Sequence, residues 1–543
     1  MEPPRDPDPG APGDRRWFGL TLFAGGLLLI LTLWLSKDRD GLATSDEAAY
    51  SAQADSLLAD GSLTIDFVRH YHVEYPPEIA HPEDFYPPGN GALLALSQAL
   101  LGRSEFSNMV PSALFGCLLL PLLAFLLARA IGVSAPFSCA VALAVMFEAE
   151  VRDLSTQGLA DLPFIFLLLL ALLLILRGAN HWGALLSGAL LAASFYFKPT
   201  AILFAPGLAL AHWIAVRPRF RRLCLHWTLM GAAFLLVSGP WLVRNQRLFG
   251  DPLYSGNKHL SAASLDPDYE YNDIRKVYWA DPEYRPADLG GSMLRHGWRP
   301  LLTRVLLHLY EAFVLKGREV FNVGFLLAAL VFFRQRKVAA ILAVVLSFTL
   351  ALSVVFAVEA RYLLPCVPLS LAVIFLLAER VVFALDQRTF LPGTGLEWLA
   401  PRPLGRGGGV ALLLATLWIY PGAAALTRDL AFGVPSFAPG NEAIPVAADW
   451  VERHLPPDAA VMHQQALRFH YYSRRPAVET PFDGPDEIQA VVERYRIGCI
   501  IYDPGVSYAK RTREYLDAYF ERYGDAWRTV KPEEGDFVVY LPR

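Results

Sequence analysis

The sequence predicts an α-helical polytopic membrane protein of about eleven transmembrane helices, followed by a small soluble α/β domain at the C-terminus. Hydrophobic residues make up 54% of the 543 residues, and charged residues only 18%. Leucine-rich stretches of about 18–20 residues, each long enough to cross a hydrocarbon core of about 30 Å, recur as far as residue 427. Beyond that residue the composition becomes that of a soluble domain. These three observations fix the expected class.

The membrane domain is expected at residues 17–427. The predicted spans are 17–36, 108–131, 133–149, 162–177, 182–197, 199–216, 223–243, 319–333, 338–357, 362–385 and 409–427. Residues 1–16 are rich in proline and acidic residues and precede no cleavage site, so we expect a disordered cytoplasmic tail and a retained first span. Two long loops, 37–107 and 244–318, separate the spans.

The distribution of basic residues predicts the topology. With these spans, the main clusters of arginine and lysine all fall on the side that the positive-inside rule assigns to the cytoplasm. They are Arg15, Arg16, Arg129, Arg177, Arg217, Arg219, Arg221, Arg222, Arg334, Arg336, Lys337, Arg380, Arg388, Arg402 and Arg406. The protein would then lie in the cytoplasmic (inner) membrane with its N-terminus inside. Both long loops and the C-terminal domain would be extracytoplasmic, on a face without ATP or nucleotide sugars.

The C-terminal segment 428–543 is expected to form the α/β domain. Helices are predicted at 447–455, 486–495 and 510–524, and strands at 459–465, 497–503 and 536–541. The segment carries no phosphate-binding loop and no catalytic triad. The run from Arg468 to Tyr472 (RFHYY) could contact a substrate, although an ordinary domain surface explains it as well. Nothing in the sequence indicates a nucleic acid as partner.

Two adjacent carboxylates, Asp46 and Glu47, follow the first span in the segment SDEAAY. A carboxylate at the outer membrane surface can accept a proton from a substrate bound at the edge of the bilayer, which makes Asp46 a candidate general base. Glu47 could bind a substrate or orient the site. If the segment is helical, Tyr50 shares the face of Asp46. The alternative is that the two acids only occupy the first turn of a helix, with Ser45 as its N-cap.

Further acidic candidates border the fourth span. Asp161 precedes Leu162–Pro163, where a carboxylate could equally cap the helix. Asp153 follows Arg152 and could be an ordinary solvated, ion-paired acid. Either could share a divalent metal cation with Asp46, because carboxylates are typical ligands of hard cations. The sequence gives no distances, so a metal cofactor stays open.

Basic candidates lie at the outer ends of spans, namely Lys198, Arg244 and Arg361. Cations there could stabilise an anionic group at headgroup depth. The alternative is that they only reach toward water from the ends of their helices. The first long loop adds Arg69, His70, His72, Glu74, His81, Glu83 and Asp84, whose spacing matches no recognised metal-ligand motif.

Six segments, in this order, give the chain a resemblance to a known superfamily. They are SDEAAYSAQADSLLADG, DFYPPGNGALLALSQALLG, RDLSTQGLADLPFIFLLLLAL, SFYFKPTAILFAPG, GPWLVRNQRLFGDPLYS and EARYLLPCVPLS. Together they resemble the GT-C membrane glycosyltransferases, which include protein O-mannosyltransferases and the lipid A aminoarabinose transferase. The resemblance implies an inverting transfer of a sugar from a polyprenyl-phosphate donor to an acceptor at the outer face. The acceptor could be a lipid, a polysaccharide or a protein.

One segment departs from the aminoarabinose transferase pattern. That enzyme carries an acidic residue and a lysine immediately before its proline, whereas this chain has Phe85 and Tyr86. The departure argues against aminoarabinose as the sugar, and Tyr86 is a candidate wall of the sugar site. Two other classes stay open: an O-antigen ligase or polymerase, which also uses polyprenyl-linked sugars, and a transporter. The transporter would need paired repeats or broken polar helices at mid-membrane, and the sequence shows no similarity between its halves.

Overall fold

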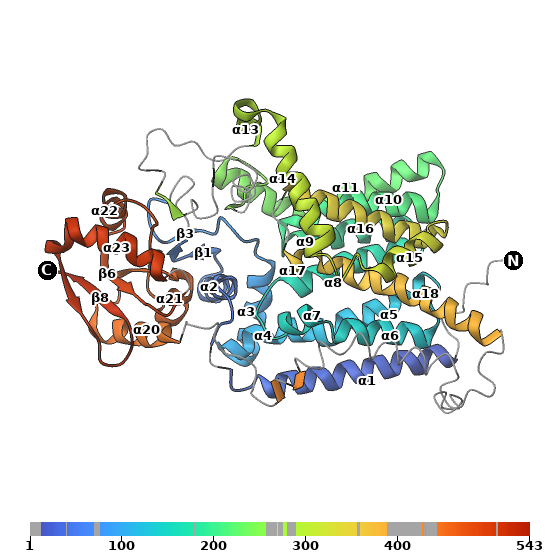
Figure 1. Ribbon diagram of the computed structural model, residues 1–543, viewed down its shortest axis with the longest axis horizontal. Coiled ribbons are helices and arrows are strands. Elements are labelled where there is room, and N and C mark those ends of the chain that lie inside the picture. Colours follow the sequence, from blue (N-terminus) through green and yellow to red (C-terminus); the bar gives the residue numbers. More distant parts are fainter. Residues whose placement is uncertain are drawn as a thin grey trace. The chain divides into compact units, whose positions relative to one another are not determined.

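The computed structural model describes residues 12–39, 41–69, 76–178, 180–256, 269, 275–277, 279, 289–355, 359–387, 426–427, 429–430, 442–506 and 509–543. The chain divides into two compact units, whose elements are labelled in Figure 1. The helical unit comprises 1–38, 109–252 and 305–434, and the mixed unit comprises 39–108, 253–304 and 435–543. Most of each long loop, residues 39–107 and 253–304, therefore belongs to the same compact unit as residues 435–543 of the C-terminal segment.

The helical unit is built from the apolar runs of the sequence. Its elements are α1 (Pro12–Leu35), α4 (Glu105–Leu114), η1 (Phe115–Leu119), α5 (Leu120–Ala130), α6 (Ala135–Met146), α7 (Ala149–Leu154), α8 (Asp161–Leu176), α9 (His181–Phe195), η2 (Pro199–Phe204), α10 (Ala205–Val216), α11 (Phe220–Phe249), α14 (Trp298–Tyr310), η5 (Glu311–Leu315), α15 (Val323–Phe332), α16 (Arg336–Val355), α17 (Ala360–Leu363), η6 (Leu364–Cys366) and α18 (Val367–Gln387). Two of them, α4 and α14, continue into the mixed unit.

Each predicted span from 17–36 to 362–385 coincides with a helix or with consecutive helices of this unit. Among the described residues, 6 helices are long and apolar enough to cross a membrane, at 14–35, 105–130, 199–216, 220–249, 336–355 and 360–383. The other predicted spans correspond to shorter apolar helices, α6, α8, α9 and α15. The span predicted at 409–427 lies, except for 426–427, outside the described residues. The expected class, a polytopic helical membrane protein with a C-terminal sheet region, is confirmed.

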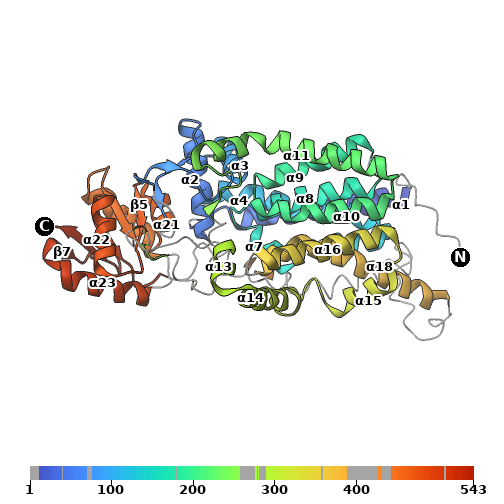
Figure 2. The same ribbon diagram turned by 90° about the horizontal axis from the view of Figure 1, so that it is seen from above.

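Close helix packing holds the helical unit together. Figure 2 shows α8, α9, α10, α11 and α16 running side by side, and contacts join α9 to α11, α8 to α9 and α10 to α16. Gly188 of α9 lies against the backbone of Met230 of α11, where any Cβ atom would clash with the Met230 carbonyl group. Small residues of this kind allow membrane helices to approach closely.

The mixed unit combines helices with a sheet of 6 strands. Its elements are α2 (Ser45–Ala59), β1 (Thr64–Ile65), β2 (Phe67–Val68), β3 (His81–Pro82), α3 (Gly89–Leu101), α13 (Leu289–His296), α20 (Ala443–His454), β4 (Ala460–His463), α21 (Ala466–Ser473), β5 (Ala477–Glu479), α22 (Pro485–Arg494), β6 (Ile497–Tyr502), α23 (Ala509–Tyr523), η8 (Gly524–Ala526), β7 (Trp527–Val530) and β8 (Val538–Pro542). The predicted helices and strands of the C-terminal segment are present, and α21, β5 and β7 are additional.

The strand order of the sheet is β2-β5-β4-β6-β8-β7. The first four strands are parallel to one another, and β8 and β7 continue the sheet in antiparallel fashion. The edge strand β2 comes from the first long loop, not from the C-terminal segment. Arg69, Glu479, His463 and Asp503 therefore stand at the carboxyl ends of neighbouring parallel strands, the edge at which open α/β sheets usually bind ligands.

Candidate active site

The acidic pair lies in the first turn of α2, as the helical interpretation predicts. The N-cap of the helix is Thr44, whose hydroxyl accepts a 3.2 Å hydrogen bond from the Glu47 backbone N–H. The expectation that Ser45 would be the cap is wrong. The Ser45 hydroxyl instead donates to Oε1 of Gln465, just before α21, at 3.0 Å. Since Thr44 satisfies the cap, the Asp46 carboxylate is available for another role.

Asp46 accepts a 2.6 Å hydrogen bond from the hydroxyl of Tyr86 to its Oδ1 atom. The Tyr86 ring is buried and packs at a tilt against Tyr50 with ring centroids 4.6 Å apart, so Asp46 and Tyr50 share a face of α2 as expected. Burial and the charge of Asp46 raise the pKa of Tyr86 well above its usual value. The phenol therefore stays protonated and keeps donating to the carboxylate. The Glu83 carboxylate fixes this turn, because its Oε1 accepts from the backbone N–H groups of Phe85 and Tyr86 at 2.8 and 2.9 Å.

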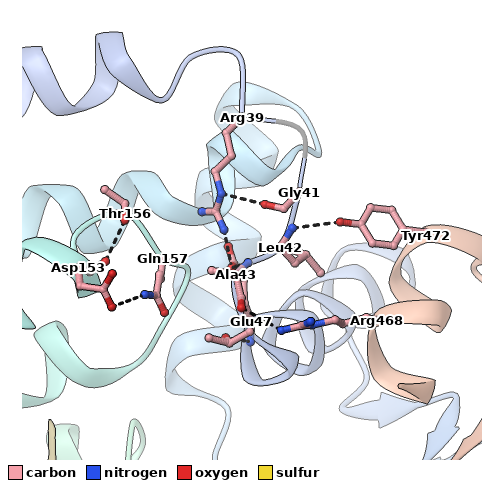
Figure 3. A network of polar contacts seen from close by, with 11 residues as sticks. Arg39, Gly41, Leu42, Ala43, Glu47, Asp153, Thr156, Gln157, Arg468 and Tyr472 are labelled. Atoms are coloured by element: carbon pink, nitrogen blue, oxygen red, sulfur yellow. Dashed lines mark hydrogen bonds and ion pairs between the residues drawn. The ribbon is translucent and has the colours of Figure 1, made fainter. Parts of the chain in front are cut away.

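Glu47 forms a buried ion pair with Arg39. Its Oε2 lies 2.7 Å from Nη2 of Arg39, and the two side chains are 0% and 1% exposed. The same oxygen accepts from the Ala43 backbone N–H at 3.1 Å, and Arg39 Nε donates to the Gly41 carbonyl at 2.9 Å. Figure 3 shows these hydrogen bonds joining Arg39 to Gly41 and to Glu47. This geometry supports an orienting role for Glu47.

Two more arginines of the mixed unit interact with the charge of Asp46, Arg69 and Arg468. Arg69 follows β2, and its guanidinium lies 4.4 Å from the Phe85 ring and 4.6 Å from the Tyr86 ring. Arg468 lies in the first turn of α21 and donates from Nη2 to the Ala43 carbonyl at 2.9 Å (Figure 3). The sequence singles out both only as members of polar runs, and nothing in it pairs them.

Asp84 lies beside this group in a buried setting that disfavours its charge. Burial, and next the charge of Glu83, raise the pKa of Asp84 from 3.8 to about 6. The folded protein therefore holds this proton more tightly than the unfolded chain does. Stability is thus expected to fall as the pH rises from about 4 to about 6, and to stay lower above that range.

We therefore expect Asp84→Asn to stabilise the protein by about 1–3 kcal/mol at pH 8, and by only about a third of that at pH 4.5. Thermal unfolding midpoints of the purified protein at both pH values measure this difference. The matched control is Asp449→Asn, at an exposed acid on α20, which should change the midpoint little at either pH. An equal gain at both pH values would exclude titration of Asp84 as the cause.

A second group of predicted residues gathers in the helical unit. Lys198 Nζ lies 2.6 Å from Oδ1 of Asp161, with side chains 18% and 5% exposed. The N-cap of α8 is Ala160, so the alternative that Asp161 caps this helix is wrong. The Asp161 carboxylate forms the ion pair with Lys198 instead. Lys198 Nζ also lies 5.6 Å from the ring of Tyr362, and the Arg361 guanidinium lies 5.3 Å from the same ring. Lys198 and Arg361 thus lie near the same aromatic ring, and Asp161 pairs with Lys198.

Asp153 and Arg244 also belong to the helical unit, and each contacts residues close to it in the sequence. Asp153 is exposed and its Oδ2 accepts from Nε2 of Gln157 at 2.8 Å (Figure 3). Arg152, by contrast, is buried and donates to the hydroxyl of Thr32 at 2.8 Å. Arg244 lies 4.5 Å from the ring of Trp241 on α11 and donates to the side chain of Asn245 at 3.0 Å.

The described part of the chain contains no group of three or more His, Cys, Asp or Glu side chains placed to hold a metal ion. His70, His72 and Glu74 lie outside the described residues. Whether the protein uses a metal cofactor stays open, as it does from the sequence.

Comparison with known proteins finds one matching sequence family and several solved structures of the same fold. The sequence model of the dolichyl-phosphate-mannose-protein mannosyltransferase family matches residues 85–243. ArnT from Cupriavidus metallidurans bound to undecaprenyl phosphate is 15% identical in sequence. It superposes with a TM-score of 0.55 over 97% of this chain and 98% of its own. A search of curated proteins finds no match.

Two further solved structures share the fold. The archaeal oligosaccharyltransferase AglB from Archaeoglobus fulgidus, in complex with an inhibitory peptide and a dolichol-phosphate, is 13% identical. It has a TM-score of 0.56 over 98% of this chain and 75% of its own. The arabinofuranosyltransferase AftD from Mycobacteria is 16% identical, with a TM-score of 0.53 over 97% of this chain and 41% of its own. The resemblance of this chain to the GT-C membrane glycosyltransferases is thereby confirmed, in fold over nearly its whole length and in sequence over residues 85–243.

Proposed function

We propose that this protein is an inverting glycosyltransferase that moves a hexosyl or pentosyl group from a polyprenyl-phosphate donor to an acceptor at the outer face of the cytoplasmic membrane. The observation that carries the proposal is Asp46, oriented by Tyr86 at the start of α2, in a chain with this fold. ArnT is bound to undecaprenyl phosphate and AglB to a dolichol-phosphate, which supports a lipid-phosphate donor for this chain as well.

In the proposed reaction Asp46 is the general base. As the acceptor hydroxyl or amine attacks the anomeric carbon, its proton passes to Asp46 and the new glycosidic bond forms on the face opposite the phosphate. The bond between the anomeric carbon and the phosphate oxygen breaks, and the polyprenyl phosphate leaves with its electrons. The proton on Asp46 is later released to water. The configuration of the anomeric carbon is inverted.

The other residues have supporting roles in this proposal. Tyr86 holds the Asp46 carboxylate and borders the sugar, and Glu47 positions the first turn of α2 through Arg39. Lys198, Arg244 and Arg361 bind the phosphate of the donor, because a cation at headgroup depth stabilises the charge of the leaving group. Asp161 and Asp153 contribute to substrate binding, and Asp161 keeps Lys198 in place at 2.6 Å.

The proposed orientation rests on the basic clusters of the sequence, which put the N-terminus in the cytoplasm and the C-terminal domain outside. This places Asp46 on the face where a lipid-linked donor supplies the activated sugar. Labelling single cysteines at exposed positions of α23 and of 217–222 from outside intact cells tests the orientation. Labelling of the helix alone agrees with it, and labelling of 217–222 alone contradicts it.

The activity is tested by reconstituting the purified protein in liposomes with a panel of radiolabelled polyprenyl-phosphate sugars. Membrane lipid, polysaccharide and protein fractions serve as acceptors. We expect label from one donor to enter one fraction with inverted anomeric configuration. Elongation or block transfer of an oligosaccharide would instead favour an O-antigen ligase or polymerase. Uptake of a soluble solute into the liposomes without transfer would favour a transporter.

A further inference from the structure

Two guanidinium groups of the mixed unit carry buried N–H groups without a partner. Nε and Nη2 of Arg69, and Nε of Arg468, are inaccessible to solvent and have no hydrogen-bond partner in the described part of the chain. Arg468 as a whole residue is only 7% exposed. A buried polar donor without a partner is costly, and more so on a charged group, so such atoms usually have a partner in the working protein.

The positions of these atoms indicate what the partner is. Nε–H and one Nη2–H of Arg69 point in the same direction and form the side-on fork with which arginine binds both oxygens of a carboxylate or phosphate. Phe85 and Tyr86 pack against the guanidinium at 4.4 and 4.6 Å and hold its plane in place. The open donors of Arg69 therefore fit an anion with two or more oxygens.

The two arginines come from distant parts of the chain. Arg69 stands at the carboxyl end of β2, and Arg468 is held to residues 42–44 through the Ala43 carbonyl at 2.9 Å. The Arg69 guanidinium packs on the ring of Tyr86, whose hydroxyl holds Asp46 at 2.6 Å, and the charge of Asp46 acts on both arginines. The charges of Glu83 and Glu47 also act on Arg69 and Arg468, respectively, but the open N–H groups of the two arginines donate to neither carboxylate.

We propose that Arg69 and Arg468 bind an oxyanion of a substrate, a phosphate or a carboxylate, beside Asp46. This inference rests on the proposed function and adds a substrate group to it. The oxyanion has two possible sources: the phosphate of the lipid donor, or an acidic group of the acceptor. In both cases the arginines hold the substrate against the base that takes its proton.

Binding is measured without turnover, by calorimetric titration of the purified full-length protein in nanodiscs with undecaprenyl phosphate and, separately, with inorganic phosphate. We expect Arg69→Gln and Arg468→Gln each to weaken the affinity for at least one of these probes tenfold or more. Arg69→Lys keeps the charge but loses the fork, so its affinity should fall between those of the wild type and Arg69→Gln.

The matched control is Arg103→Gln. Arg103 is an arginine of the same unit whose Nε already donates to both oxygens of Asp55, at 2.9 and 3.0 Å, and whose Nη2 donates to the Tyr471 carbonyl at 3.0 Å. Its replacement should leave both affinities unchanged. Thermal unfolding midpoints of all variants show whether they are folded. If a glutamine variant is not folded, the lysine variant of the same arginine, Arg69→Lys or Arg468→Lys, serves as the test.

The two sources give different results. Weaker binding of undecaprenyl phosphate assigns the site to the donor. Unchanged binding of undecaprenyl phosphate, with weaker binding of inorganic phosphate and a raised KM for the acceptor found in the transfer assay, assigns it to an acidic acceptor. Folded variants with wild-type affinities and KM values would overturn the proposal. Asp46→Asn separates this test from the proposed function, because it should lower kcat of transfer by about 10²–10⁴-fold yet bind the phosphate probes at least as tightly as the wild type.

Discussion

Asp46→Asn is expected to lower kcat of sugar transfer by about 10²–10⁴-fold, because a positioned general base contributes a factor of this size. The asparagine keeps the shape of the side chain, and its Oδ1 can still accept the hydrogen bond that the Tyr86 hydroxyl donates at 2.6 Å in the wild type. The fold and the affinity for the donor should therefore change little. Steady-state transfer kinetics with the donor identified in the reconstituted assay measure the effect.

The controls for this variant come from the same helix and the same hydrogen bond. Asp55→Asn removes another carboxylate of α2, one that pairs with Arg103 at 2.9 Å, and should cost less than tenfold in kcat. Tyr86→Phe keeps the ring that packs against Tyr50 but removes the donor to Asp46, so we expect its loss of kcat to lie between those of Asp55→Asn and Asp46→Asn. Wild-type transfer by Asp46→Asn would exclude it as the base.

The sequence predicts most of the helical unit because each span is a long, locally coded signal. An uncharged run such as 338–357 has few alternatives to a membrane helix, and the structure has α16 at 336–355. The helical start at Asp46 is also local, since small and polar residues in the pattern T-S-D-E are typical of a first turn. The element, but not the cap residue, is correctly predicted.

What the sequence could not show depends on contacts between distant residues. Strand β2 has 2 residues, too few for any periodicity, and its partner β5 lies at 477–479. The hydrogen bond from Tyr86 to Asp46 joins residues 40 positions apart. Arg468 reaches a carbonyl 425 positions away. Such pairs are set by the tertiary fold, and the propensities of single segments carry no information about them.

The pair of Arg39 and Glu47 gives the largest expected effect on stability. Glu47→Gln is expected to destabilise the protein by about 3–5 kcal/mol, because it leaves the guanidinium of Arg39 buried without its opposite charge. The shift of the thermal unfolding midpoint measures this change. Glu534→Gln is the matched control: it breaks an exposed pair with Arg453, with side chains 42% and 53% exposed, and should change the stability by less than about 1 kcal/mol.

The double variant Arg39→Met/Glu47→Leu then separates the two roles open to Glu47. Replacing both members of a buried ion pair by apolar side chains of similar size is often neutral, so most of the lost stability should return. If Glu47 only positions the first turn of α2, transfer should recover together with stability, because Thr44 still caps the helix at 3.2 Å and Tyr86 still holds Asp46. If the midpoint recovers but kcat or KM does not, Glu47 contacts a substrate directly, and the orienting role inferred from its ion pair is wrong.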